Sequence, residues 1–281
     1  MTVNEPSESE SPELPGGPAK DNYRVAVFGE PDDVTVLKDI LTECAGMHPD
    51  DALTAARVAP GILPGRFSRE AAEAVAAQVE RRGIKAAALC ETDIPKLDHA
   101  EKAHHARCQT DGLAVLGLHA ELERLIPWYD VSLLSVGCVP IETVPRFSAE
   151  SAVVLHAAPN PHRAAVEAAP HTGMALWLAC ERPWTVYRVL HTQMNYEYLG
   201  ERKTDSASRN FALFVEDLSQ HAPQAYLTPA TRAFLQHGHQ RQFEFQSPGA
   251  LRDETILHLL LMRFISSAAA PGTSTASVRA S

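Results

Sequence analysis

The sequence predicts an α+β protein in which a small domain of helices and strands precedes an antiparallel β sandwich or barrel with C-terminal helices. Residues 23–90 alternate between strand and helix patterns in the order β-α-α-β-α-β. Residues 105–191 contain short apolar segments separated by turn residues, which is typical of antiparallel sheets. Beyond residue 205 the apolar residues recur every three or four positions, which indicates helices.

The first domain opens with a strand and two helices. Residues 23–28 (YRVAVF) have the apolar, β-branched character of a strand, and the GEPDD turn that follows supplies an aspartate to cap a helix. The helical pattern begins at Val34 and stops at Gly46, since glycine favours helix ends. Pro49 suits the first turn of the second helix, where a backbone N–H would have no helical partner.

The same domain closes with a strand, a helix and a further strand. Residues 62–67 are interrupted by a proline and a glycine, so this strand suits only a sheet edge. Ser68 is placed to cap a helix over residues 71–82. Residues 84–90 form an apolar run that predicts the closing strand.

This order and these residues resemble the C-terminal domain of the bacterial ribosomal stalk protein, and more loosely the ClpS adaptor that shares its fold. The match runs without a gap through Gly46, Asp51, Ala52, Ala59, Pro60, Gly65, Ser68, Ala72, Glu73, Ala74 and Gly83. The resemblance implies that residues 22–91 form a protein-recognition domain without chemistry of its own. In the stalk protein the first two helices bind translational GTPases. We therefore expect the partner-binding surface on these helices, at Val34, Leu37, Lys38, Leu41 and Leu53.

A second domain is expected over residues 104–265. Seven short strand patterns occur, at residues 105–109, 113–119, 122–128, 131–140, 152–157, 174–180 and 184–191. The last two are separated by residues 181–183 and predict a hairpin. A helix after residue 206 places four apolar residues on one face, namely Phe211, Phe214, Val215 and Leu218, and helices are also expected at residues 228–236 and 248–264.

Strands followed by an amphipathic helix resemble the pleckstrin-homology-like architecture, and the segment IPWYDVSLLSVG looks like its second and third strands. Lipid-binding members of that class carry several Lys and Arg in an early loop. Residues 119–124 contain Arg124 alone, so phosphoinositide binding is not expected.

The remaining segments are predicted from composition. Residues 1–21 are acidic and rich in Pro, Ser and Glu, and residues 266–281 lack aromatic residues, so both are expected to be disordered tails. Residues 92–103 are polar and are expected to form the linker between the domains.

Charge and cysteine content narrow the function classes. The formal net charge of -10 and the absence of a basic stripe argue against a nucleic-acid partner. The five cysteines are scattered within apolar runs, which favours reduced thiols over a disulfide framework. The first residues lack the basic and apolar character of a signal peptide, and no apolar run reaches the roughly 20 residues of a membrane span. We therefore expect a cytoplasmic protein with no membrane partner.

Histidines of the second domain suggest an alternative. His99, His104, His105 and Cys108 lie close enough in sequence to suggest a metal site, although a strand that begins at residue 106, with His104 at its exposed end and Cys108 buried, is the favoured explanation. A second group, His156, His162 and His171, falls in a segment rich in Pro and Ala, which is more typical of an exposed loop.

A segment near residue 200 has the composition of a protein interface. It contains Tyr196, Tyr198 and Arg202, and tyrosine and arginine are enriched at binding surfaces. We expect this segment to form a second interface.

No motif for nucleotide binding, metalloprotease chemistry, serine hydrolysis or calcium binding occurs in the sequence. The sequence therefore predicts a non-enzymatic adaptor or scaffold that uses no cofactor and binds a protein partner through its N-terminal domain. Two alternatives remain open: a metal-dependent or small-molecule-binding enzyme that uses the second-domain histidines, and a ribosome-associated protein that binds translation factors.

Overall fold

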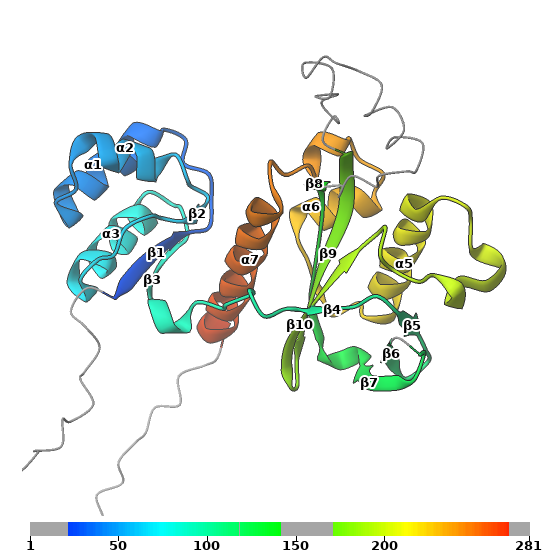
Figure 1. Cartoon of the computed structure of the whole chain (residues 1–281). Helices are drawn as coiled ribbons and strands as arrows, with labels where there is room; N and C mark the ends of the chain where they lie inside the picture. Colours follow the sequence, from blue (N-terminus) through cyan, green and yellow to red (C-terminus); the bar gives the residue numbers. More distant parts are fainter. Residues whose placement is uncertain (1–21, 118, 142–170, 270–281) are drawn as a thin grey trace, which may run out of the picture. The chain divides into compact units, whose positions relative to one another are not determined.

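The computed structural model describes residues 22–117, 119–141 and 171–269. The chain divides into two compact units, Met1–Ile94 and Pro95–Ser281. Each unit combines helices with antiparallel strand pairs, which confirms the mixed helix and strand class (Figure 1). The predicted strand at residues 152–157 and the disorder predicted for residues 1–21 and 270–281 lie outside the described residues.

The N-terminal unit contains a three-stranded antiparallel sheet in the order β2-β1-β3, with β1 in the centre. Helices α1 and α3 pack against each other, and α3 also packs on β1 and β3. The elements run in the order β1 (Tyr23–Val27), α1 (Val34–Ala45), α2 (Pro49–Ala56), β2 (Gly61–Ile62), α3 (Arg69–Arg81) and β3 (Ala86–Cys90).

Local sequence signals explain where these helices begin and end. Asp33 caps α1, because its side chain accepts a hydrogen bond from the backbone N–H of Thr35. Gly46 ends α1 with a φ of 64°, a conformation that glycine adopts without a steric penalty. Ser68 caps α3 by accepting a hydrogen bond from the backbone N–H of Ala71, as predicted.

The edge strand is shorter than predicted. Residues 62–67 were expected to form it, whereas β2 covers only Gly61–Ile62 and an isolated bridge joins Phe67 to Tyr23. Pro64 interrupts the pairing, because proline has no N–H to donate to a neighbouring strand.

The C-terminal unit contains a five-stranded sheet in the order β11-β8-β9-β10-β4 and a separate three-stranded sheet in the order β5-β6-β7. The strands are β4 (Glu101–Lys102), β5 (Ala106–Cys108), β6 (Gly112–Leu116), β7 (Leu122–Pro127), β8 (Val131–Ile141), β9 (His171–Glu181), β10 (Trp184–Leu190) and β11 (Tyr226–Leu227). The α-helices are α5 (Ala207–His221), α6 (Pro229–Leu235) and α7 (Pro248–Ala269).

Strands β8, β9 and β10 form an antiparallel meander that is covered on both faces. One face packs against α5, α6 and the three-stranded sheet, through residues such as Leu134 and Phe214. The other face packs against α7, through residues such as Trp177 and Leu251 (Figure 1). Burial on both faces explains the nearly continuous apolar sequence of β8.

Two predictions for this unit are confirmed. β9 and β10 form an antiparallel hairpin in which Glu181 pairs with Trp184. Helix α5 buries the expected face, which comprises Phe211, Phe214, Val215 and Leu218.

Two predicted boundaries are wrong. Part of the expected linker, residues 92–103, belongs to the C-terminal unit: Leu97 is 2% exposed within its core, and β4 pairs in parallel with β10. The tail expected from residue 266 is wrong for residues 266–269, because α7 continues to Ala269. Neither feature has a strong sequence signal, since β4 is only two residues long and the end of α7 is a run of small residues.

Candidate functional site

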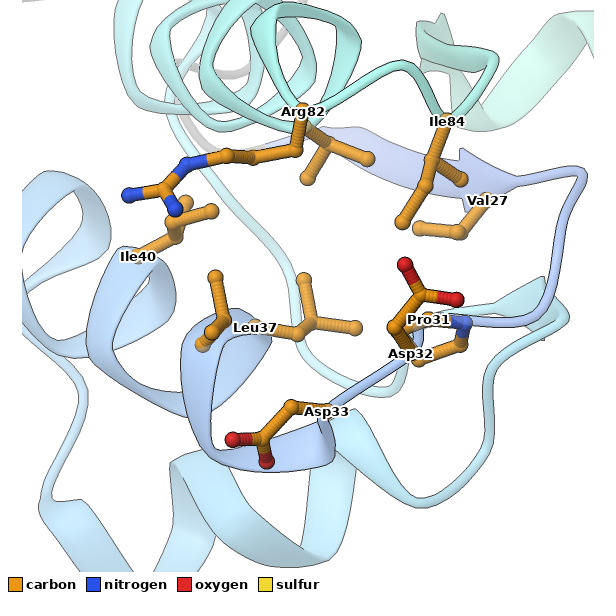
Figure 2. A pocket seen from close by; sticks show the side chains of 10 residues that line it. Val27, Pro31, Asp32, Asp33, Leu37, Ile40, Arg82 and Ile84 are labelled. Carbon is orange, nitrogen blue, oxygen red and sulfur yellow. The ribbon is translucent and has the colours of Figure 1, made fainter.

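A cavity of about 260 Å³ in the N-terminal unit lies between β1, α1 and the end of α3 (Figure 2). Its walls are apolar. Val27 of β1, Leu37 of α1 and Val79 of α3 are at most 3% exposed. Ile40 and Ile84 complete these walls, and we call this space the α1–α3 cavity.

The chain positions these walls through two features. Leu37 and Ile40 lie one helical turn apart, so both face the core side of α1. Gly83 follows the end of α3 with a φ of 82° and turns the chain back, which brings Ile84 to the cavity.

The mouth of the α1–α3 cavity is polar. It is formed by Asp32, Asp33 and Arg82, with Pro31 and the half-buried Val36 beside them. Figure 2 shows the Asp32 carboxylate directed toward Val27 and Ile84, whereas the Asp33 carboxylate turns toward the start of α1.

The two carboxylates have different roles. The Asp33 carboxylate accepts hydrogen bonds from the side chain and the backbone of Thr35, at 2.7 and 2.8 Å, and these bonds cap α1. The same hydrogen bonds lower the pKa of Asp33. Asp32 is exposed, and within the described ranges no hydrogen bond or ion pair ties its side chain. Asp32 is therefore the carboxylate that is available to a ligand.

The α1–α3 cavity is suited to binding more than to chemistry. Among the described residues, its lining contains no serine, cysteine, histidine or lysine, and its ionisable groups are two carboxylates and one guanidinium. Apolar walls with a few polar groups at the mouth are typical of recognition sites.

The residues predicted to bind a partner are only partly available. Leu37 lines the α1–α3 cavity, and Val34 and Leu53 are half-buried. Lys38 is half-buried and forms an ion pair with Asp39 at 2.8 Å. Leu41 has no exposed surface and lies in the core, so it does not contact a partner directly.

Sequence reasoning missed the contribution of α3 to this site. Val27, Ile40, Arg82 and Ile84 were not singled out, because the predicted surface lay on the first two helices. The available signal was the Arg-Gly-Ile run at the end of α3, in which a glycine stop precedes an apolar residue.

The expected interface near residue 200 is built mainly from inward-facing side chains. Tyr196 is 5% exposed, and its hydroxyl donates to the backbone carbonyl of His191 at 3.0 Å. The hydroxyl of the half-buried Tyr198 donates to Asp217 at 3.0 Å. Both tyrosines thus belong to the core of the C-terminal unit, in contrast to the sequence expectation.

Arg202 binds the same carboxylate as Tyr198, that of Asp217. Its guanidinium donates two hydrogen bonds to Asp217, at 2.9 and 2.6 Å, while part of its side chain stays exposed. Burial raises the pKa of Cys108 to about 12, and the nearby Asp217 acts in the same direction. The cluster therefore supports the fold and holds no activated thiol.

In the described part of the chain, no group of three or more His, Cys, Asp and Glu side chains is placed to hold a metal ion. His99 and His104 are exposed, whereas Cys108 lies beside Tyr198. His156 and His162 lie outside the described residues, and His171 begins β9.

A second cavity, of about 250 Å³, lies beside His104 and His105 and is called the histidine cavity. Lys102, Glu123 and Asn195 also line it. The Nε2 atom of His105 is buried and has no hydrogen-bond partner within the described ranges. Burial, together with the nearby positive charge of Arg107, lowers the pKa of His105.

Comparison with known proteins finds no match for this chain among protein-family models, curated proteins or solved structures. None of the helices in the described part of the chain combines the length and the apolar character that a membrane span requires.

Proposed function

We propose that this chain is a non-enzymatic adaptor or scaffold that binds a protein partner through the α1–α3 cavity. The observation that carries the proposal is the pairing of apolar walls with carboxylates at the mouth. An apolar side chain of the partner fills the cavity, and a neighbouring positive charge faces Asp32.

The chemistry of the cavity defines the kind of segment that it accepts. Its apolar anchor residue gains free energy by leaving water, as buried anchors do at other interfaces. A lysine, an arginine or a free amino terminus next to that anchor meets Asp32, whose carboxylate has no partner among the described residues. The negative charge of the whole chain adds long-range attraction for a basic partner.

Affinity capture with the full-length chain as bait tests the proposal. The bait is wild type, Asp32→Lys, or Val36→Phe, which enlarges a half-buried lining residue and fills the cavity. Glu43→Lys is the matched control, because Glu43 is an exposed residue of α1 that does not line the cavity. We expect a partner that wild type and control retain and that both cavity variants lose.

A synthetic peptide from the captured protein, with its apolar residue next to a basic one, should compete for the bait. A partner that all four baits retain equally would contradict the proposed site. If the partner is a translational GTPase and Lys38→Glu abolishes its capture, the function is the translation-factor role that the stalk resemblance implies.

We also propose that the N-terminal unit has the fold of the ribosomal stalk C-terminal domain and ClpS, and that the C-terminal unit is a pleckstrin-homology-like sandwich. The order of helices and strands supports the first assignment. The second is supported by the core that the three-stranded and five-stranded sheets share through residues such as Val115 and Leu178. Superposition of experimental structures of each unit on these families tests both.

The histidine cavity supports a second candidate function, in which the C-terminal unit binds a small molecule and acts on it. The Nε2 of His105 favours this candidate, because it is buried without a hydrogen-bond partner among the described residues and such an atom costs free energy unless a ligand or water satisfies it. A thermal-shift screen of small polar metabolites against wild type and His105→Gln tests it. A hit that persists in His105→Gln would argue against this role.

A further inference from the structure

A third cavity, of about 490 Å³, lies in the C-terminal unit between the end of the five-stranded sheet and the start of α7. We call it the sheet cavity. Its volume falls in the range of roughly 300–1,000 Å³ that is typical of small-molecule sites. Its described lining contains none of the residues that were predicted to bind a partner or a metal.

The floor of the sheet cavity consists of paired residues on β9 and β10. Arg188 stands opposite Trp177 and Leu190 stands opposite Ala175 in the antiparallel register. Side chains of directly opposed residues share one face of the sheet, so all four lie on the face that α7 covers. Leu251 of α7 and Val139 of β8 also border the cavity.

Arg188 is the one charged residue among the described residues that line the sheet cavity. Its guanidinium carbon lies 6.0 Å from the centre of the Trp177 ring, which holds the charge over an aromatic wall. In the described ranges no carboxylate forms an ion pair with Arg188. The cavity thus combines apolar walls with the polar side chains of Gln193, Gln246 and Ser247 and with one positive charge that has no countercharge among the described residues.

We propose that the sheet cavity binds a small amphipathic carboxylate. The carboxylate forms a two-point hydrogen-bonded pair with the Arg188 guanidinium, whose planar fork matches a carboxylate. The apolar body of the ligand lies against the half-buried Pro140, Ile141 and Leu190. A single arginine suits a monoanion, and a polyphosphate would require more cationic groups than this lining provides.

Calorimetric titration of the full-length protein with octanoate, 1-octanol and octylamine tests the proposal. The three probes share an apolar chain and carry a negative, neutral and positive head group. We expect octanoate to bind at least about tenfold more tightly than the other two, because a hydrogen-bonded ion pair is gained with octanoate alone. Octanoate should also change the fluorescence of Trp177, which lines the cavity.

Substitutions locate the binding. Arg188→Gln should weaken octanoate binding about tenfold or more, and Arg188→Lys should retain part of the affinity because it retains the charge. Arg209→Gln is the matched control, since Arg209 is an exposed arginine of α5, on the opposite side of the sheet. Ala175→Phe, which fills the floor of the cavity, should abolish binding while the Arg188 charge is kept.

Far-ultraviolet circular dichroism confirms that each variant is folded before it is titrated. Equal affinity for octanoate and octylamine, unchanged affinity in Arg188→Gln, or no binding of octanoate to the folded wild-type protein would each overturn the proposal.

Discussion

Arg202 and Asp217 form a two-point ion pair in which both guanidinium Nη atoms donate to the two carboxylate oxygens, at 2.9 and 2.6 Å. The Asp217 side chain is 9% exposed, whereas that of Arg202 is 54% exposed. The pair thus neutralises a buried negative charge from the surface. It ties the segment after β10 to helix α5.

Removal of the arginine should destabilise the C-terminal unit. Arg202→Gln leaves the Asp217 carboxylate with its hydrogen bond from Tyr198 and without its countercharge. We expect a loss of about 2 kcal/mol in the free energy of unfolding, as is typical for a hydrogen bond to a charged group. Urea unfolding followed by tryptophan fluorescence measures it, because Trp128, Trp177 and Trp184 all lie in this unit. Arg209→Gln, at an exposed site, should unfold at the wild-type midpoint.

The same ion pair predicts a pH dependence. Burial alone raises the pKa of Asp217, but the hydrogen bonds from Arg202 and Tyr198 outweigh it and lower the pKa below the ordinary value of 3.8. The stabilisation is therefore fully present above pH 3.8 and is lost as the pH falls through the lower pKa of the folded state. The difference in stability between wild type and Arg202→Gln should be constant near neutrality and shrink below pH 3.8. A constant difference down to pH 2 would argue against this assignment.

The sequence predicted best those elements whose apolar residues have a clear period. The buried face of α5 is the clearest example, because Phe211, Phe214, Val215 and Leu218 recur with helical spacing. The starts of α1 and α3 could also be predicted, since aspartate and serine, here Asp33 and Ser68, commonly cap helices. Such signals depend only on neighbouring residues.

The errors concern side chains whose environment depends on distant elements. Tyr198 is of a residue type that is common at interfaces. Its hydroxyl instead donates a hydrogen bond to Asp217 of the following helix, so its side chain faces the interior. Leu41 belongs to the apolar face of α1, and that face packs in the core of the N-terminal unit. Periodicity identifies an apolar face without showing whether the protein core or a partner covers it.

The candidate site was predicted only in part for the same reason. Leu37 was expected to bind a partner and does line the α1–α3 cavity. Arg82 and Ile84 reach the cavity from the end of α3, more than 40 positions further along the chain than Leu37. The Arg-Gly-Ile run marks the end of α3, but only the packing of α3 beside α1 places Arg82 and Ile84 at the cavity.

The cysteines of the chain should differ in their reactivity toward iodoacetamide. Burial raises the pKa of both Cys108 and Cys180 to about 12, so almost none of either thiol is ionised at pH 8. We expect iodoacetamide to leave both unmodified in the folded protein and to modify both in urea. Peptide mass spectrometry measures the extent at each site, with the half-buried Cys90 as the reference in the same sample. Modification of Cys108 as fast as that of Cys90 would show that its surroundings open in solution.

Helix α7 should be an integral part of the C-terminal unit. Leu251 is fully buried and packs with Trp177 and Leu259 on one face of the five-stranded sheet. Leu251→Ala removes apolar contacts and leaves a cavity, so we expect the free energy of unfolding to fall by about 3 kcal/mol. Ile265→Ala, at a position of the same helix that is 45% exposed, should change it by less than about 0.5 kcal/mol. Both values follow from urea unfolding monitored by tryptophan fluorescence, and equal effects of the two substitutions would contradict the packing of α7 on the sheet.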